Sequence, residues 1–269
     1  MSIYWFRLDD TTKSIFTFTV CPLSFVGTCG NLFTIIALLQ SKTLRVEAST
    51  KFIISLALAD FLFCSIYLPI SIYGLITKER TQTYCYSHYF TYYGSCTASM
   101  CSLTAVTINR YISVCHNGIY TKIYSDFKVA LMISIIWLFS FGYSIWASGK
   151  MGPNKEINIC SVSDIDSLDS LNFFFAIYFV APCIIIISSY AAIYFKVRKT
   201  RKELQECLGG KAESAFKVDI PILSFVVNRN KKHVDKLSAV KNRSIIWRQI
   251  QGTINFLLLF FRNFKHVYA

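Results

Sequence analysis

The sequence predicts an all-α fold, a polytopic bundle of transmembrane helices. Hydrophobic residues make up 54% of the 269 residues and charged residues only 16%, whereas soluble domains carry about 25% charged residues. Long apolar windows without charge recur along the chain as far as Lys196. Basic residues gather in the connections between these windows, a pattern that is typical of membrane proteins and that disfavours a soluble enzyme.

Five windows are long enough to cross a bilayer, because about 20 apolar residues span its hydrocarbon core. We predict that each forms a spanning helix that is apolar around its circumference. Buried helices of a large soluble protein are the alternative, but such helices usually carry a polar stripe. The windows lie between Lys13 and Lys42, Lys51 and Lys78, Arg80 and Arg110, Lys128 and Lys150, and Asp169 and Lys196, with Asp60 as the one interruption.

Basic residues after the first, third and fifth windows predict that these connections are cytoplasmic. The N terminus is then outside, the chain is a multi-pass protein of the plasma membrane, and the first span acts as an uncleaved signal anchor. The expected segments are an extracellular N terminus (1–13), five spans with their loops (14–197), a basic cytoplasmic segment (198–248) and a short apolar C-terminal segment (249–269).

Two cysteines test this orientation. Cys85 lies at the outer mouth of the third window, and Cys160 lies in the outer connection between the fourth and fifth. Both face the oxidising compartment, so we predict a disulfide between them. Two free thiols are the alternative.

Polar residues inside the spans are candidate functional groups. Asp60 is the one acid there, and a charge at mid-membrane costs about 2.5 to 3.5 kcal/mol. With Asn31 and Ser99 it forms either a site for a small cation or water cluster, or a polar packing network without an ion. Arg110 ends the third window, where spacing alone favours a simple basic anchor at the membrane surface.

Several residues recur in one order along these spans. They are Gly30-Asn31, Leu56-Ala57-Leu58-Ala59-Asp60, Cys85 placed 25 residues before Arg110, Trp137, Cys160, and Pro182 placed eight residues before Tyr190. In order and spacing they resemble the rhodopsin-like (class A) G-protein-coupled receptors, over residues 14 to 202. The resemblance implies a seven-helix receptor fold, of which five spans are present.

The resemblance also implies roles for these residues. The receptor transmits an extracellular ligand signal to a heterotrimeric G protein. Asn109, Arg110, Tyr111 and Tyr190 form the G-protein coupling switch, and Asp60, Asn31 and Ser99 form a sodium site, with no other cofactor expected. Trp137 and Pro182 are structural. Asn-Arg-Tyr, in place of the usual Asp-Arg-Tyr, resembles an orphan subgroup that includes Moody and the trapped-in-endoderm receptors, relatives of the melatonin-type branch.

The ligand class follows from the same alignment of motifs. Monoamine receptors carry an aspartate seven residues after the third-helix cysteine, where this sequence has Tyr92, so a monoamine is disfavoured. An aromatic, mostly apolar pocket suits a lipid, a small hydrophobic molecule or a peptide side chain. For Tyr84, Tyr86 and Tyr89 an aromatic belt at the membrane interface is the alternative. The expected pocket residues are Tyr89, Tyr92, Tyr93, Cys96, Phe174, Phe175 and Tyr178.

Motifs of a sixth and a seventh receptor helix do not follow Lys196. The last uncharged window, from Gln249 to Phe261, has 13 residues, fewer than the roughly 20 that span a bilayer. We therefore expect a truncated receptor, in which this apolar piece is the stump of a sixth helix, an interfacial helix or out-of-frame sequence. Such a chain is expected to associate with another receptor copy, or to be retained in the endoplasmic reticulum and degraded. The alternative function is a non-signalling membrane partner of a full-length receptor.

Other function classes find less support. A transporter would show matched broken helices or an internal repeat, and the four histidines are scattered, without nucleophile-base or metal-ligand spacing. The net charge of +13 would suggest nucleic acid for a soluble protein. However, 13 of the 28 basic residues lie between Arg198 and Arg248, so we expect the bilayer and a G protein as partners, and no nucleic acid.

Overall fold

The computed structural model describes residues 10–77, 80–154, 159–162, 170, 173–174 and 176–207, without the side chains of 10–13, 159, 201 and 203–207. The chain divides into two compact units, Met1–Tyr194 and Phe195–Ala269. All contacts described below lie within the first unit. Residues 1–9 of the predicted segment 1–13, all but the first part of 198–248, and the whole of 249–269 lie outside the described residues.

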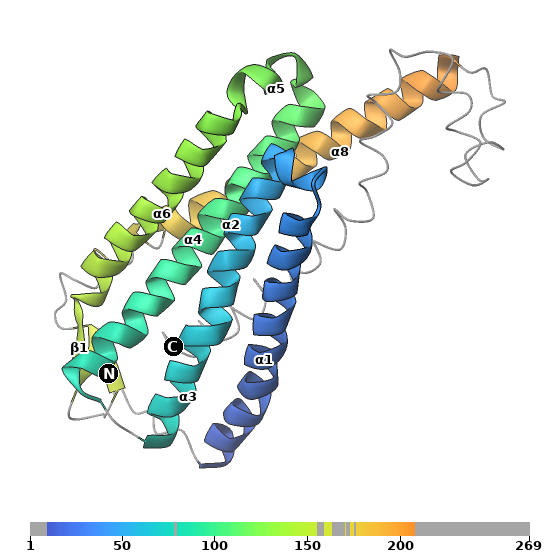
Figure 1. Ribbon diagram of the computed structural model, residues 1–269. Coiled ribbons are helices and arrows are strands. Elements are labelled where there is room, and N and C mark those ends of the chain that lie inside the picture. Colours follow the sequence, from blue (N-terminus) through green and yellow to red (C-terminus); the bar gives the residue numbers. More distant parts are fainter. Residues whose placement is uncertain are drawn as a thin grey trace. The chain divides into compact units, whose positions relative to one another are not determined.

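The first unit is a bundle of long helices, in which α1, α2, α4 and α6 run side by side (Figure 1). Short helical segments join them, and a two-stranded antiparallel hairpin follows α6. The elements are α1 (Asp10–Gln40), η1 (Leu44–Val46), α2 (Ala48–Leu62), η2 (Phe63–Tyr67), α3 (Leu68–Thr77), α4 (Gln82–Cys115), α5 (Asn117–Ile123), α6 (Asp126–Ser148), β1 (Met151–Asn154), β2 (Ile159–Val162), η3 (Ala176–Val180) and α8 (Ala181–Cys207).

Four helical stretches of the described chain are long and apolar enough to cross a membrane. They are Ser14–Gln40, Ala48–Thr77, Asp126–Ser148 and Ala176–Thr200, and they match the first, second, fourth and fifth predicted windows. The third window lies in α4, a helix of 34 residues. α4 does not join this group because serine, threonine and tyrosine are frequent in it, so the expectation of five windows that are apolar all round was wrong for α4.

The polarity of α4 is explained by its place in the bundle. It packs against both α2 and α6, so much of its surface contacts protein, and most of its buried side chains are small and polar. Several hydroxyls of α4 are satisfied within the helix: Thr91 donates to the carbonyl of Ser87 at 2.5 Å, and the buried Ser95 donates to that of Thr91 at 2.6 Å. Such back-bonding removes the cost of burying a hydroxyl.

Two π-helical turns interrupt the spans, and each ends two residues before a proline. η2 precedes Pro69 and η3 precedes Pro182. Proline has no backbone N–H and displaces the carbonyl of the preceding turn, and a π-turn is one way in which a helix absorbs that change. In η2 the carbonyl of Cys64 accepts a hydrogen bond from Ser24 Oγ of α1 at 2.7 Å.

Three helices are joined by a short hydrogen-bond chain at mid-bundle. The hydroxyls of Ser55 in α2 and Ser102 in α4 lie 2.9 Å apart. Trp137 Nε1 of α6 donates to Ser55 Oγ at 3.1 Å. The structure therefore places Trp137, expected to be structural, where α6 meets α2 and α4.

Candidate functional site

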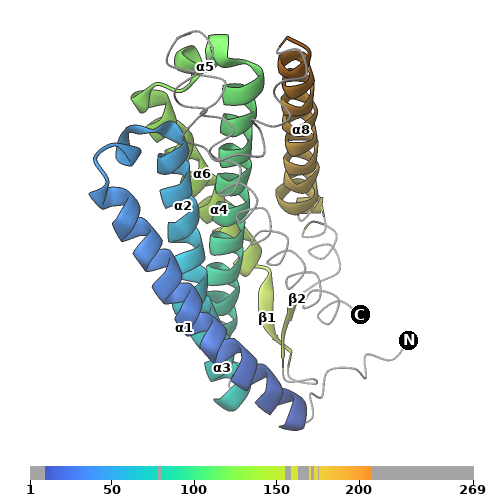
Figure 2. The same cartoon turned by 90° about the vertical axis from the view of Figure 1, so that its right-hand side faces the viewer.

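The bundle carries predicted site residues at two ends, which we name the disulfide end, around Cys85, and the Arg110 end. At the disulfide end the hairpin β1–β2 is fastened to α4 (Figure 2). The Cys85–Cys160 disulfide, with Cα atoms 5.5 Å apart, confirms the predicted bond. Tyr89 Oη donates to the carbonyl of Cys160 at 3.2 Å, and Gln82 Nε2 to that of Met151 at 3.1 Å.

Aromatic side chains from α4, α6, η3 and the residues just before η3 pack together beside the hairpin. The rings of Tyr143 and Tyr178 stack with centroids 4.6 Å apart. The rings of Trp146 and Phe174 lie 4.7 Å apart, and Tyr93 meets Tyr143 edge-on at 5.5 Å. The structure thus brings Tyr93, Phe174 and Tyr178 of the predicted pocket together, whereas Phe175 lies outside the described residues.

A second group of rings lies between α4 and the η2–α3 segment. We call Tyr67, Tyr84, His88 and Tyr92 the histidine group. His88 stacks on Tyr84 with centroids 5.6 Å apart, and Tyr67 lies 5.0 Å from His88 and 5.1 Å from Tyr92. Tyr89 meets the His88 ring edge-on at 5.1 Å, linking the histidine group to the hairpin.

Sequence reasoning missed His88 and Tyr67 as neighbours of the predicted pocket. A signal was available for His88, because residues four apart share a helix face and Tyr84, His88 and Tyr92 follow that spacing. Tyr84 and Tyr89 both donate to backbone carbonyls, those of Ile70 and Cys160, so these two rings face protein. Tyr86, at 38% exposure, is the one of the three suggested belt residues that faces outward.

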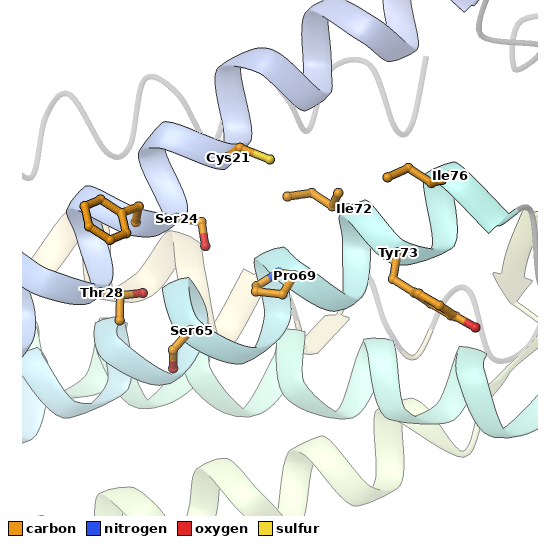
Figure 3. A pocket seen from close by; sticks show the side chains of 9 residues that line it. Cys21, Ser24, Thr28, Ser65, Pro69, Ile72, Tyr73 and Ile76 are labelled. Atoms are coloured by element: carbon orange, nitrogen blue, oxygen red, sulfur yellow. The ribbon is translucent and has the colours of Figure 1, made fainter.

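A crevice of about 520 Å³ opens between α1 and the η2–α3 segment (Figure 3). It contains none of the predicted pocket residues. The most apolar stretch of α1, the helix that forms one wall of this crevice, has no buried side chain. Its lining residues are Cys21, Ser24, Phe25, Thr28, Ser65, Pro69, Ile72, Tyr73 and Ile76.

At mid-bundle the structure joins two of the three residues of the predicted sodium site. Ser99 Oγ donates to Asp60 Oδ1 at 2.7 Å, which links α4 to α2. Asn31 Nδ2 donates instead to the carbonyl of Gly27 in its own helix at 2.9 Å. The pairing of Asp60 with Ser99 suits either interpretation of this site, and occupancy by a cation stays a prediction.

At the Arg110 end, Asn109 is fully buried and links two elements. Its Oδ1 accepts a hydrogen bond from Ser49 Oγ in the first turn of α2 at 2.5 Å. Its Nδ2 donates to Tyr120 Oη of α5 at 3.4 Å. No sequence motif pointed to Ser49 or Tyr120. Arg110, next along α4, is half-buried.

The other predicted switch residues lie apart from this link. Tyr111 Oη lies 3.1 Å from His116 Nε2, at the end of α4. Tyr190 is half-buried on α8. Tyr124 packs beside Tyr120 with ring centroids 5.1 Å apart. Burial raises the pKa of Tyr124, and the nearby Tyr120 adds to the effect.

Comparisons with known proteins agree with the geometry. Residues 30–261 match the 7 transmembrane receptor (rhodopsin family) profile, farther along the chain than the resemblance up to residue 202 suggested. The G-protein coupled receptor moody of Drosophila melanogaster is 35% identical over 72% of this chain and 30% of its own length. Protein trapped in endoderm-1 of the same species is 32% identical over 70% of this chain and 49% of its own length. Melatonin receptor type 1B of Mus musculus is 26% identical over 65% of this chain and 49% of its own length.

These relatives confirm the subgroup that the Asn-Arg-Tyr sequence indicated. The chain spans less than half the length of each of the three. With its membrane-length helices and its Cys85–Cys160 disulfide, it is a membrane protein. By the family match over most of its length, the chain belongs to the rhodopsin family of 7 transmembrane receptors.

Proposed function

We propose that this chain acts as a receptor in the plasma membrane, binds an extracellular ligand at the disulfide end, and activates a heterotrimeric G protein at the Arg110 end. The observation that carries the proposal is the continuity of α4. This one helix carries Cys85, Tyr89 and Tyr93 beside the hairpin, Ser99 and Arg110. A ligand that binds one population of the bundle more tightly shifts the other end through such a shared element.

The proposed ligand is apolar or aromatic and carries no cationic amine as its main anchor. The aromatic residues of α4, α6 and η3 supply apolar contact area. Tyr92, at the position expected for an aspartate that pairs with an amine, packs against Tyr67 and Tyr93. We propose recognition and signal transfer as the function, in keeping with the receptor family to which the chain belongs.

Nucleotide exchange on purified G proteins tests this function. The full-length receptor in lipid nanodiscs is expected to accelerate GDP release from at least one class of heterotrimer, and Arg110→Ala is expected to abolish the acceleration. Arg45→Ala is the matched control, because Arg45 lies in the short η1 segment, outside α4. Exchange that survives Arg110→Ala, or no acceleration with any class, contradicts the proposal.

We propose that Asp60 and Ser99 hold a sodium ion in the resting receptor. Replacing potassium chloride by sodium chloride in the buffer is then expected to raise the thermal stability of the wild type. An ion that binds only to the folded state stabilises that state. Asp60→Asn is expected to remove this difference, since it removes the charge that binds the ion. The same sodium response in both proteins would favour a polar packing network instead.

Asn109 is proposed to leave Arg110 less restrained than an aspartate would. The amide is neutral and its two ends are held by Ser49 and Tyr120. Asn109→Asp introduces a carboxylate next to Arg110, so basal nucleotide exchange is expected to fall. Ser49→Ala, which removes a contact of Asn109 without adding a charge, is the control. Unchanged basal exchange in Asn109→Asp contradicts this prediction.

A further inference from the structure

His88 is the one imidazole among the rings of the histidine group. It lies on the face of α4 that turns toward the η2–α3 segment, between Tyr84 and Tyr92 along the helix. Three phenol rings, those of Tyr67, Tyr84 and Tyr89, lie around it with centroids 5.0, 5.6 and 5.1 Å away. A polar ring in such surroundings normally has both nitrogens hydrogen-bonded, because burial otherwise costs about 1 to 3 kcal/mol.

The hydrogen bonds of Ser71 favour one tautomer of this imidazole. Ser71 Oγ lies 2.9 Å from the carbonyl of Tyr67, to which it can donate its one proton, and 3.0 Å from His88 Nε2. Both contacts are satisfied together when His88 Nε2 is the donor to Ser71 Oγ, so we assign the proton of the neutral ring to Nε2. A neutral imidazole that carries its proton on Nε2 has a bare lone pair on Nδ1, which makes Nδ1 a hydrogen-bond acceptor.

This acceptor is unsatisfied. Within the described part of the chain, His88 Nδ1 is buried and has no hydrogen-bond partner. The ring of Tyr84 stacks on the imidazole, and its hydroxyl lies 3.4 Å from the carbonyl of Ile70 and packs against Gly74. Tyr84 is only half-buried, so this side of the histidine group lies near the surface of the bundle.

We propose that His88 Nδ1 accepts a hydrogen bond from the ligand, and that the ligand is therefore an apolar or aromatic molecule with an N–H or O–H donor. This inference rests on the proposed receptor function and narrows its ligand class. A carboxylate or ether at this position would place two acceptors face to face and leave both unsatisfied. The apolar or aromatic part of the ligand is expected to pack against Tyr67 and Tyr92, whose rings contact each other beside His88.

Two matched probe molecules distinguish the contribution of a hydrogen-bond donor to binding from that of the aromatic rings. Indole and 1-methylindole have the same fused rings, and only indole has an N–H. Binding to the full-length receptor in nanodiscs is measured for both. We expect indole to bind the wild type about tenfold more tightly, the equivalent of one hydrogen bond. His88→Phe is expected to bind both probes equally, and His88→Asn, which keeps an acceptor oxygen near the Nδ1 position, to retain the preference.

Nitrogen-15 NMR of the receptor with labelled histidines reports the protonation of His88 Nδ1 directly. If His88 had only a structural role, indole would not change this signal. The His88 signals are identified by their loss in His88→Phe. We expect Nδ1 to resonate as an unprotonated nitrogen in the resting receptor and to shift on addition of indole but not of 1-methylindole. Equal binding of the two probes, binding of neither, or a protonated Nδ1 at rest overturns the inference.

The same preparations separate this inference from the proposed function. Arg110-dependent nucleotide exchange is measured on each without a probe. If exchange is present and the indole preference is absent, the role of His88 is wrong and the receptor function stands. If exchange itself is absent, the receptor function fails. The free energy of unfolding of His88→Phe, measured in parallel, shows that the variant is folded.

Discussion

Cys85→Ser is expected to lower the free energy of unfolding by about 4 kcal/mol, the chain-entropy value for a loop that joins residues 75 apart. The disulfide closes this loop across α4, α6 and the hairpin. Without it, the Tyr89 and Gln82 hydrogen bonds to Cys160 and Met151 hold the hairpin in place. These are worth about 1 kcal/mol each. Denaturant unfolding in detergent micelles under oxidising conditions measures the difference.

Cys21→Ser is the matched control for this change. Cys21 is a free, exposed cysteine of α1, so the same chemical replacement there is expected to change stability by less than about 0.5 kcal/mol. Cys160→Ser and the double variant should match Cys85→Ser, because each removes the same bond. Equal losses for Cys85→Ser and Cys21→Ser would show that the disulfide contributes little.

Gly27→Val is expected to destabilise the bundle by about 1 to 3 kcal/mol through overpacking. A Cβ atom on Gly27 would lie 2.5 Å from Cys64 Sγ and 3.3 Å from Cys64 Cβ, where α1 meets η2. Gly30, one turn farther along α1, has nothing within 4 Å of such a Cβ. Gly30→Val is therefore expected to be neutral or slightly stabilising, since glycine is a poor residue inside a helix.

Thermal unfolding of the two variants in the same nanodiscs measures this contrast. Cys64→Ala, added to Gly27→Val, removes the clashing sulfur and is expected to restore most of the loss. Similar losses at Gly27 and Gly30, or no rescue by Cys64→Ala, would show that α1 does not pack closely on η2. The contrast is informative because both glycines look alike in the sequence.

The sequence predicted the features that depend on the bilayer and on covalent chemistry. A long apolar stretch predicts a spanning helix wherever the helix faces lipid. Four of the five predicted windows form helices that are long and apolar enough to span. α4 broke the pattern because it is surrounded by other helices, where hydroxyls such as that of Ser95 find acceptors in their own backbone. Cys85 and Cys160 were predictable because orientation leaves both in the oxidising compartment.

Hydrogen-bond partners of polar side chains were not predictable in the same way. A polar residue in a helix can bond across the bundle or back to the carbonyl four residues earlier, and both are stable. Ser99 bonds across the bundle to Asp60, whereas Asn31 bonds back to the carbonyl of Gly27 in its own helix. The contacts of Asn109 with Ser49 and Tyr120 span 60 and 11 residues and depend on where three helices end, which no local pattern specifies.

The most direct test of coupling at the Arg110 end is the isolation of a nucleotide-free complex. Full-length receptor and G-protein heterotrimer are mixed, the released nucleotide is hydrolysed, and the mixture is separated by size. The wild type is expected to co-elute with the heterotrimer as one complex that GTP dissociates, and Arg110→Ala is expected to elute alone. A complex that forms equally with Arg110→Ala, or that GTP does not dissociate, would contradict coupling through this end of the bundle.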